Sequence, residues 1–186
     1  MKGAMLGLKG RTDASWTAVA LRDELALLRD HAHLERKAAG HVLTLIGQVP
    51  EAGPALLEVA REELEHFDRV CGVLRARGEE LGPDGGNPYV RRLARAGGAT
   101  LLDRVLRMGL IEARSYERFC LLAEAAGGDL RALYEGLKES EAGHHALFLR
   151  IAYDRWPREE VRERWSELAE TEAAIIAATT WGPRIH

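Results

Sequence analysis

The sequence predicts an all-α protein, a four-helix bundle with an additional C-terminal helix. Three observations support this prediction. Apolar residues recur alternately three and four positions apart over most of the 186-residue chain, which is the spacing of the buried face of a packed helix. No segment shows the alternation of apolar and polar residues that is typical of a strand. Segments rich in Gly and Pro separate the periodic runs.

Length and composition limit the number of domains and the class of protein. The chain has 186 residues, 46% of them hydrophobic, so we expect a single domain over residues 1–186. The bundle should span about residues 16–155 and the C-terminal helix about 158–180. Two cysteines without C-x-x-C spacing favour a cytoplasmic protein over a disulfide-stabilised secreted one. We expect no membrane span and no signal peptide, because no apolar run is long enough.

The first predicted helix ends at the segment QVPEAGP, whose prolines and glycine interrupt the helical pattern. Glu35 is the one charged residue on its apolar face. That face reads Leu21, Leu25, Leu28, Ala32, Glu35, Ala39, Val42 and Ile46.

The second predicted helix has two polar residues on its apolar face. The face reads Leu56, Val59, Glu63, His66, Val70 and Val73. The segment RGEELGPDGGNPY follows, and its Gly, Pro and Asn residues predict an irregular connection until the helical pattern resumes near Val90. This is the longest connection that we expect in the chain.

Three more helices complete the prediction. The third, which ends at Gly127, has the face Leu101, Val105, Met108, Glu112, Tyr116 and Phe119. The fourth, which ends near Trp156, has the face Leu130, Tyr134, Leu137, Glu141, His144, Phe148 and Ile151. The C-terminal helix has the face Val161, Trp165, Leu168, Glu172 and Ile175.

Polar residues interrupt these apolar faces in a repeated pattern. The motif E-x-x-H occurs at residues 63–66 and 141–144. A separation of three residues places both side chains on one face of a helix. Glu35 precedes the first motif by 28 residues, and Glu112 precedes the second by 29. The order Glu, then E-x-x-H, therefore occurs twice, as expected for an internal repeat of two helical hairpins.

These residues form a candidate metal site. Its members are Glu35, Glu63, His66, Glu112, Glu141 and His144. On a buried face an unpaired carboxylate would be strongly destabilising, whereas two divalent cations balance four carboxylates and two neutral imidazoles. Ferritin-like di-iron and di-manganese bundles have this ligand set. The alternative is a set of partly exposed or salt-bridged glutamates, with Arg36, Lys37 or Arg114 as partners.

The remaining histidines and several glutamates are predicted to lie outside the site. His31, one turn before Glu35, either hydrogen-bonds a ligand or, as we expect, is a solvated surface residue. Surface positions are also expected for His33, His41 and His145, and solvated ones for Glu62, Glu65, Glu117 and Glu139. Two aromatic residues near the proposed metals are interpreted as core residues, Tyr116 and Tyr134.

Four stretches carry a resemblance to a known family. They are RDHAHLERKAAGHVLTLI, VAREELEHFDRVCGVLRARG, RVLRMGLIEARSYERFCLLAE and LKESEAGHHALFLRIA. They resemble the tRNA-modifying hydroxylases that act on 2-methylthio-N-isopentenyl-adenosine beside the anticodon. The similarity runs from about Leu25 to Ile151, and the strings IEARS-x-ERF and SEA-x-H are more specific than a generic helix.

The resemblance implies a ferritin-like di-iron fold whose ligands fall on the same six residues. It also implies a di-iron monooxygenase that uses two iron ions and dioxygen as co-substrate to hydroxylate the isopentenyl group of a tRNA adenosine. Because the chain has no flavin motif and no iron–sulfur cysteine pattern, we expect an external electron donor or reductase.

A tRNA substrate requires a local basic surface, since the formal net charge is −3. Residues 75–107 contain seven arginines against four acidic residues. The candidate patch is Arg91, Arg92, Arg95, Arg104 and Arg107. The alternative is an ordinary solvated face, because Tyr89 is the only aromatic residue interleaved with these arginines.

Two other functions would use the same six residues. A ferritin-like peroxidase or ferroxidase would be favoured by a closed site that only small oxidants reach. A non-enzymatic interaction module, stabilised by metal, would have a coordinatively closed site. The family resemblance favours the hydroxylase.

Overall fold

The computed structural model describes residues 6–186, which contain helices and no strand. In chain order the elements are α1 (Trp16–Ala20), α2 (Glu24–Ile46), the 3-10 helix η1 (Pro50–Ala52), α3 (Gly53–Ala76), α4 (Pro88–Ala96), α5 (Leu101–Ala125), α6 (Gly128–Glu135), α7 (Lys138–Arg155) and α8 (Arg158–Ala177).

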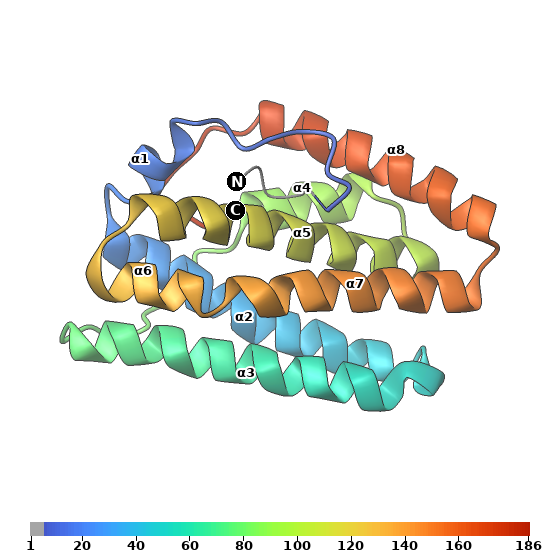
Figure 1. Ribbon diagram of the computed structural model, residues 1–186, viewed down its shortest axis with the longest axis horizontal. Coiled ribbons are helices and arrows are strands. Elements are labelled where there is room, and N and C mark those ends of the chain that lie inside the picture. The colour runs from blue at the N-terminus through green and yellow to red at the C-terminus, as the bar shows by residue number, and fades with distance from the viewer. Residues whose placement is uncertain (1–5) are drawn as a thin grey trace.

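Two long hairpins build the bundle (Figure 1). Helix α2 packs along α3, and α5 packs along α7, with the short helix α6 in line with α7. Helix α8 lies over α4 and α5, on the side of the bundle away from α3. The predicted fold is confirmed: a ferritin-like four-helix bundle with an additional C-terminal helix. That helix ends three residues before the predicted position.

The core of the described residues has two large apolar clusters, one toward each end of the bundle, and a small third cluster between α4 and α8. One contains Val42 of α2, Leu56 of α3 and Phe148 of α7. The other contains Leu28 of α2 and Phe119 of α5. In α2, α3 and α5 the glutamates and histidine of the predicted site lie between residues of the two clusters. Those of α7 lie between Leu137, just before this helix, and Phe148. The site is therefore a polar layer between two apolar ones.

The long connection after α3 crosses α2 before α4 begins. Asp84 in this connection forms an ion pair with Lys37 (2.6 Å), and Arg29 donates a hydrogen bond to the Glu80 carbonyl (3.0 Å). The Asn87 side chain then accepts a hydrogen bond from the Val90 amide (3.1 Å) and caps α4. The connection is irregular as predicted, and α4 begins within two residues of the expected position.

Two helix boundaries differ from the prediction. Leu21 lies in the turn between α1 and α2, and α2 begins after Asp23, whose side chain accepts from the Ala26 amide. The predicted fourth helix is divided into α6 and α7 at Gly136. Arg69 of α3 donates a hydrogen bond to the Gly136 carbonyl (3.0 Å), and glycine has a low helix propensity, so the helix is interrupted at this position.

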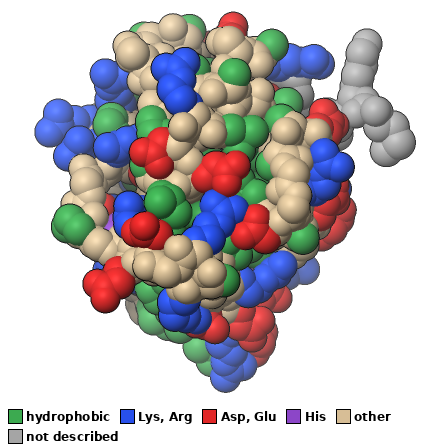
Figure 2. Space-filling model, turned by 90° about the vertical axis from the view of Figure 1, so that its left-hand side faces the viewer, with side chains coloured by type: hydrophobic (Ala, Val, Ile, Leu, Met, Phe, Trp, Pro, Cys, Tyr) green, Lys and Arg blue, Asp and Glu red, His purple; other side chains and the backbone are tan. Residues whose placement is uncertain are grey.

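Figure 2 views the molecule from the side where α1 and α6 lie in Figure 1. Lys and Arg side chains are interspersed there with Asp and Glu side chains. At this end Arg77 pairs with Glu24 of α2 (2.8 Å) and with Asp129 of α6 (2.7 Å). Within residues 6–186, every helix is too short or too polar to cross a lipid bilayer.

Candidate metal centre

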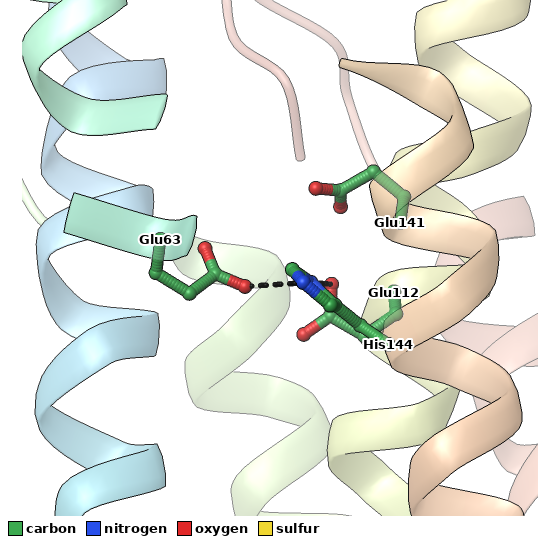
Figure 3. A group of neighbouring side chains, drawn as sticks. All are labelled: Glu63, Glu112, Glu141 and His144. Carbon is green, nitrogen blue, oxygen red and sulfur yellow. Dashed lines mark ion pairs between the residues drawn. The ribbon is translucent and has the colours of Figure 1, made fainter. Parts of the chain in front are cut away.

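The six predicted ligands meet in the polar layer. They form two groups of candidate ligand atoms within 4.8 Å of one another, Glu35 with His66 and Glu141, and Glu63 with Glu112, Glu141 and His144. Figure 3 shows the second group, in which Glu63 of α3 faces Glu112 of α5 and the two α7 residues. Glu141 belongs to both groups. All six residues are at most 5% exposed.

The orientation of His66 is set by Ser140 at the start of α7. The Ser140 hydroxyl donates a hydrogen bond to the Leu137 carbonyl (2.8 Å), so its oxygen accepts from His66 Nε2 (3.0 Å). The neutral ring therefore has its proton on Nε2 and a lone pair on Nδ1. Nδ1 lies 3.6 Å from a carboxylate oxygen of Glu35 and 3.6 Å from one of Glu141.

His144 is oriented in the same way by Glu62 of α3. The Glu62 carboxylate can only accept when it is ionised, so His144 Nε2 donates to it (2.7 Å). His144 Nδ1 is left facing Glu63 Oε1 at 3.0 Å and Glu112 Oε2 at 4.0 Å. An outer partner on the second ring nitrogen is typical of histidines that bind metal.

The inward-facing atoms of this layer require a cation. The Nδ1 atoms of His66 and His144 and one oxygen each of Glu63 and Glu141 are buried without a hydrogen-bond partner. All four atoms carry lone pairs, and such atoms repel one another unless a proton or a metal ion lies between them. Carboxylate oxygens and imidazole nitrogens suit iron and related divalent metals. The residues therefore fit a pair of divalent cations.

The electrostatics of the metal-free layer agree with this conclusion. Burial, together with repulsion from Glu35 and Glu112, raises the pKa of Glu63 well above its ordinary value. Burial and the neighbouring carboxylate of Glu112 do the same for the pKa of Glu141. Burial also raises the pKa of Glu112. Bound cations would reverse these shifts by favouring the ionised carboxylates.

His31 is part of the site, and its predicted surface position is wrong. It is 1% exposed, and its Nε2 lies 2.5 Å from Glu35 Oε1. Burial would raise the pKa of Glu35, but the interaction with His31 outweighs it and holds that pKa well below the ordinary value. The His31 ring packs between Tyr134, on which it stacks, and Phe119. Tyr134 is a fully buried core residue, and Tyr116 is half-buried.

An inner cavity of about 240 Å³ reaches the carboxylates from the side of α2, α4 and α5. Four of the candidate ligands line it, namely Glu35, Glu63, Glu112 and Glu141. Its other walls are mostly apolar and include Leu34, Ala38, Met108, Ile111 and Phe119. The lining also includes Asn87, Arg91, Ser115, Ile185 and His186.

An outer cavity of about 280 Å³ adjoins the inner one. The two share His41, Val90, Met108 and Ile111 as lining residues. Thr44 of α2 and Gln48, just after that helix, line one side of the outer cavity, and Arg104 and Arg107 of α5 line another. Together the cavities form a cleft that leads from the arginines on α5 to the candidate metal ligands.

The five arginines of the predicted patch lie around this cleft without forming one contiguous wall. Arg91 lines the inner cavity, while Arg104 and Arg107 line the outer cavity. Arg92 is exposed and donates to the Thr179 hydroxyl (3.4 Å), and Arg95 is exposed on the same helix.

Three further surface predictions are wrong. His33 is buried under the long connection, where its Nε2 lies 3.2 Å from the Gly82 carbonyl. His145 is buried against Trp165 of α8, and its Nδ1 lies 2.9 Å from the Gly109 carbonyl. Glu117 is largely buried because Thr12 donates to it (2.6 Å). Surface positions are confirmed for His41, Glu62, Glu65 and Glu139.

Sequence reasoning missed four residues that complete the site. Ser140 and Glu62 hold the two histidines, while Ser115 and His186 line the inner cavity. Ser140 lies one residue before Glu141, and Glu62 one residue before Glu63, so a search for polar neighbours of the motifs would have found both. His186 lies outside any periodic segment, and no pattern in the sequence indicates its position.

Comparisons with known proteins agree with this site. A family model described as tRNA-(MS[2]IO[6]A)-hydroxylase (MiaE) matches residues 4–186. A Pseudomonas putida protein named tRNA 2-(methylsulfanyl)-N(6)-isopentenyladenosine(37) hydroxylase is 32% identical over 182 residues, which are 94% of this chain and 89% of that protein. A Salmonella typhimurium protein of the same name is 32% identical over 130 residues, 68% of this chain and 48% of that protein.

A solved structure is also similar over nearly its whole length. It is named Protein 43 with aldehyde deformylating oxygenase activity from Synechococcus. It superposes on this protein with a TM-score of 0.89 at 40% sequence identity. The alignment covers 96% of this chain and 94% of the chain of that structure.

Proposed function

Because the chain belongs to the tRNA-(MS[2]IO[6]A)-hydroxylase (MiaE) family, we propose that it hydroxylates the isopentenyl group of a hypermodified tRNA adenosine beside the anticodon. The six residues of the polar layer would hold two iron ions, with Glu141 shared between the two positions. The iron supplies the activation of dioxygen that a C–H bond of this kind requires. One oxygen atom enters the substrate and the other leaves as water, at the cost of two electrons and two protons.

The inner cavity is the observation that carries this proposal. It brings apolar walls directly against four carboxylates of the candidate metal centre. A prenyl chain is apolar and branched, and burial in this space favours it over a polar substrate. A peroxidase or ferroxidase site would instead be closed to all but small oxidants. The walls also exclude water from the reacting carbon, which protects the oxidant from side reactions.

The outer cavity provides the next part of the substrate path. Gln48 has a buried amide oxygen without a hydrogen-bond partner, and Thr44 lies one turn before it on α2. Such groups can bind the polar edge of a base that has been turned out of its stack. Arg104 and Arg107, with Arg91, Arg92 and Arg95 of α4, would then hold the RNA backbone by charge.

An external electron donor and a cytoplasmic location complete the proposal. The sequence contains no flavin motif and no iron–sulfur cysteine pattern, and a separate reductase would supply two electrons per turnover. A tRNA substrate supports a cytoplasmic location.

Mass spectrometry of nucleosides tests the proposal. The iron-loaded protein is incubated with prenylated tRNA, dioxygen and a chemical reductant, and the tRNA is then digested. We expect the prenylated adenosine to gain one oxygen atom, and isotopically labelled dioxygen should supply that atom. A nucleoside of unchanged mass, from a preparation that contains two iron ions per chain, would contradict the proposed function.

An aliphatic aldehyde is the second substrate to assay with the same preparation. The solved relative with aldehyde deformylating oxygenase activity is 40% identical, and an alkyl chain also suits the apolar inner cavity. We expect turnover of the prenylated tRNA to exceed that of the aldehyde, because the cleft continues from the cavity to the arginines. Faster turnover of the aldehyde would assign the cavity to that substrate.

A further inference from the structure

The segment after α8 forms part of the wall of the metal site. Residues 181–186 return from α8 to the bundle, and Ile185 and His186 are 1% and 3% exposed. Both line the inner cavity together with the carboxylates of the candidate metal centre. This segment lies outside the bundle helices, and neither the motifs nor the helical repeat includes it.

Hydrogen bonds from three elements anchor the segment. Asp30 of α2 accepts from the Ile185 amide (3.0 Å). Asn87, which caps α4, donates to the His186 carbonyl (3.1 Å). Arg118 of α5 donates to the Ile185 carbonyl. The His186 ring also stacks on Tyr89 with centroids 4.9 Å apart. The ring therefore has a defined position and orientation.

The partners of His186 determine which ring nitrogen carries the proton. Arg118 Nη1 lies 3.4 Å from Nδ1, and a guanidinium group can only donate. Nδ1 must accept, so the proton of the neutral ring is on Nε2. Burial, with the charges of Arg118 and Arg114, holds the pKa of His186 well below its ordinary value, so the ring is neutral at physiological pH. Nε2 lies 3.2 Å from the Ser115 hydroxyl and donates to it.

Ser115 connects this ring to the metal layer. It lies one turn after Glu112 on α5 and lines the inner cavity together with Glu141, and its side chain opposes the rise in the pKa of that carboxylate. Because its oxygen accepts from His186, the Ser115 hydroxyl proton is free to point at Glu141. The hydrogen bonds thus run in one direction, from Arg118 through His186 to Ser115, and leave the Ser115 hydroxyl proton available to the Glu141 carboxylate.

We propose that His186 is a positioning residue of the metal centre, which orients the Ser115 hydroxyl toward Glu141 and closes one wall of the inner cavity. The inference rests on the metal centre of the proposed function. Glu141 belongs to both groups of ligand atoms, so its orientation affects both metal positions. A partner of this kind is worth about 10- to 100-fold in metal affinity.

The tautomer of His186 can be tested without metal or substrate. Nitrogen NMR of the metal-free protein with ¹⁵N-labelled histidine distinguishes a protonated Nε2 from a protonated Nδ1. We expect one neutral histidine with its proton on Nε2 that disappears from the spectrum in His186→Gln. A proton on Nδ1 would reverse the direction of the donors and overturn the proposal.

Cobalt(II) titration of the metal-free protein tests the positioning role. We expect His186→Leu and Ser115→Ala each to weaken cobalt binding about 10- to 100-fold and to change its visible absorption. His186→Gln should restore most of the cobalt affinity and of the visible absorption, because the glutamine amide can donate a hydrogen bond from near the Nε2 position. The double variant of Ser115→Ala with His186→Leu should bind no more weakly than either single variant.

His145→Leu is the matched control, since it removes a buried histidine that hydrogen-bonds a backbone carbonyl and does not line the inner cavity. It should lower the melting temperature and leave the cobalt spectrum unchanged. Wild-type cobalt binding in Ser115→Ala would overturn the proposal even if His186→Leu does not fold. Additive losses in the double variant would also overturn it. Cobalt binding is measured without tRNA, so these failures are separate from a failure of hydroxylation.

Discussion

The two sides of the metal layer are built differently. On the side of α3 and α7 a groove is lined by His66 and His144, together with Glu62 and Ser140. On the side of α2, α4 and α5 the carboxylates face an apolar cavity that is closed by residues 181–186. The first side provides hydrogen-bond acceptors for the imidazoles, and the second provides space for an apolar group. Ligand orientation and substrate access are therefore separated across the layer.

The largest effect is expected from the carboxylate ligands that lie between the two sides. Glu112→Ala and Glu141→Ala should remove metal binding and abolish turnover, because each takes an anionic donor away from a buried metal position. Iron content per chain and nucleoside mass spectrometry measure the two effects. Glu117→Ala is the control on α5. It should retain both metal and turnover, and lose stability through its contacts with Thr12 and Arg114. Loss of iron in Glu117→Ala would contradict the assigned ligands.

A large side chain in the inner cavity should block the substrate without affecting metal binding. Ala38→Phe places a ring in the inner cavity, so hydroxylation should fall at least about 100-fold while two iron ions remain bound. Gly143→Ala on the opposite side is the matched change, because a Cβ atom there meets no neighbour within 4 Å. Its turnover should stay at the wild-type value. An equal loss in both variants would mean that substrate enters through the α3–α7 groove.

An intermediate effect is expected from the partner of His144. Glu62→Ala removes the carboxylate that holds Nε2, and metal affinity should fall about 10- to 100-fold as the ring loses its orientation. Glu65→Ala, an exposed carboxylate one turn away, should leave metal affinity unchanged. Cobalt titration of both variants provides the comparison. Equal affinities would show that packing alone holds the ring.

The smallest effect concerns the arginines at the cleft. Neutralising Arg91, Arg92 and Arg95 together should weaken binding of prenylated tRNA and reduce its salt dependence by about one unit of log–log slope per lost phosphate contact. Iron content should not change. A control variant removes three exposed arginines from other surfaces, Arg61, Arg75 and Arg162. A slope equal to that of the control would exclude these arginines from the RNA-binding surface.

The helical repeat explains why the six candidate ligands could be found from the sequence. Each of them interrupts an apolar face at a regular spacing, and a helix brings such positions to one side. Two E-x-x-H motifs with a preceding glutamate therefore predict a common layer, and the structure brings the six side chains together there. The additional C-terminal helix followed from the same periodicity.

The errors have a common physical cause, which is that periodicity reports the buried face of one helix but not what covers its other faces. Tyr134 and Phe119 cover His31, the long connection covers His33, and Trp165 of α8 covers His145. His186 was missed because its burial depends on tertiary hydrogen bonds from α2, α4 and α5. An aperiodic segment contains no local signal of such contacts.

The polar layer also has a consequence for the order in which this protein assembles. The two helices of each hairpin pack closely along each other. The backbones of the α2–α3 hairpin and the α5–α7 hairpin come close to each other at few places. Both groups of ligand atoms, however, take members from both hairpins. Each hairpin can form early through contacts that are local in sequence, whereas their docking brings four carboxylates together and is opposed by charge. Metal ions bound in this layer would therefore favour docking, and part of their binding free energy would be the free energy of joining two separately formed halves.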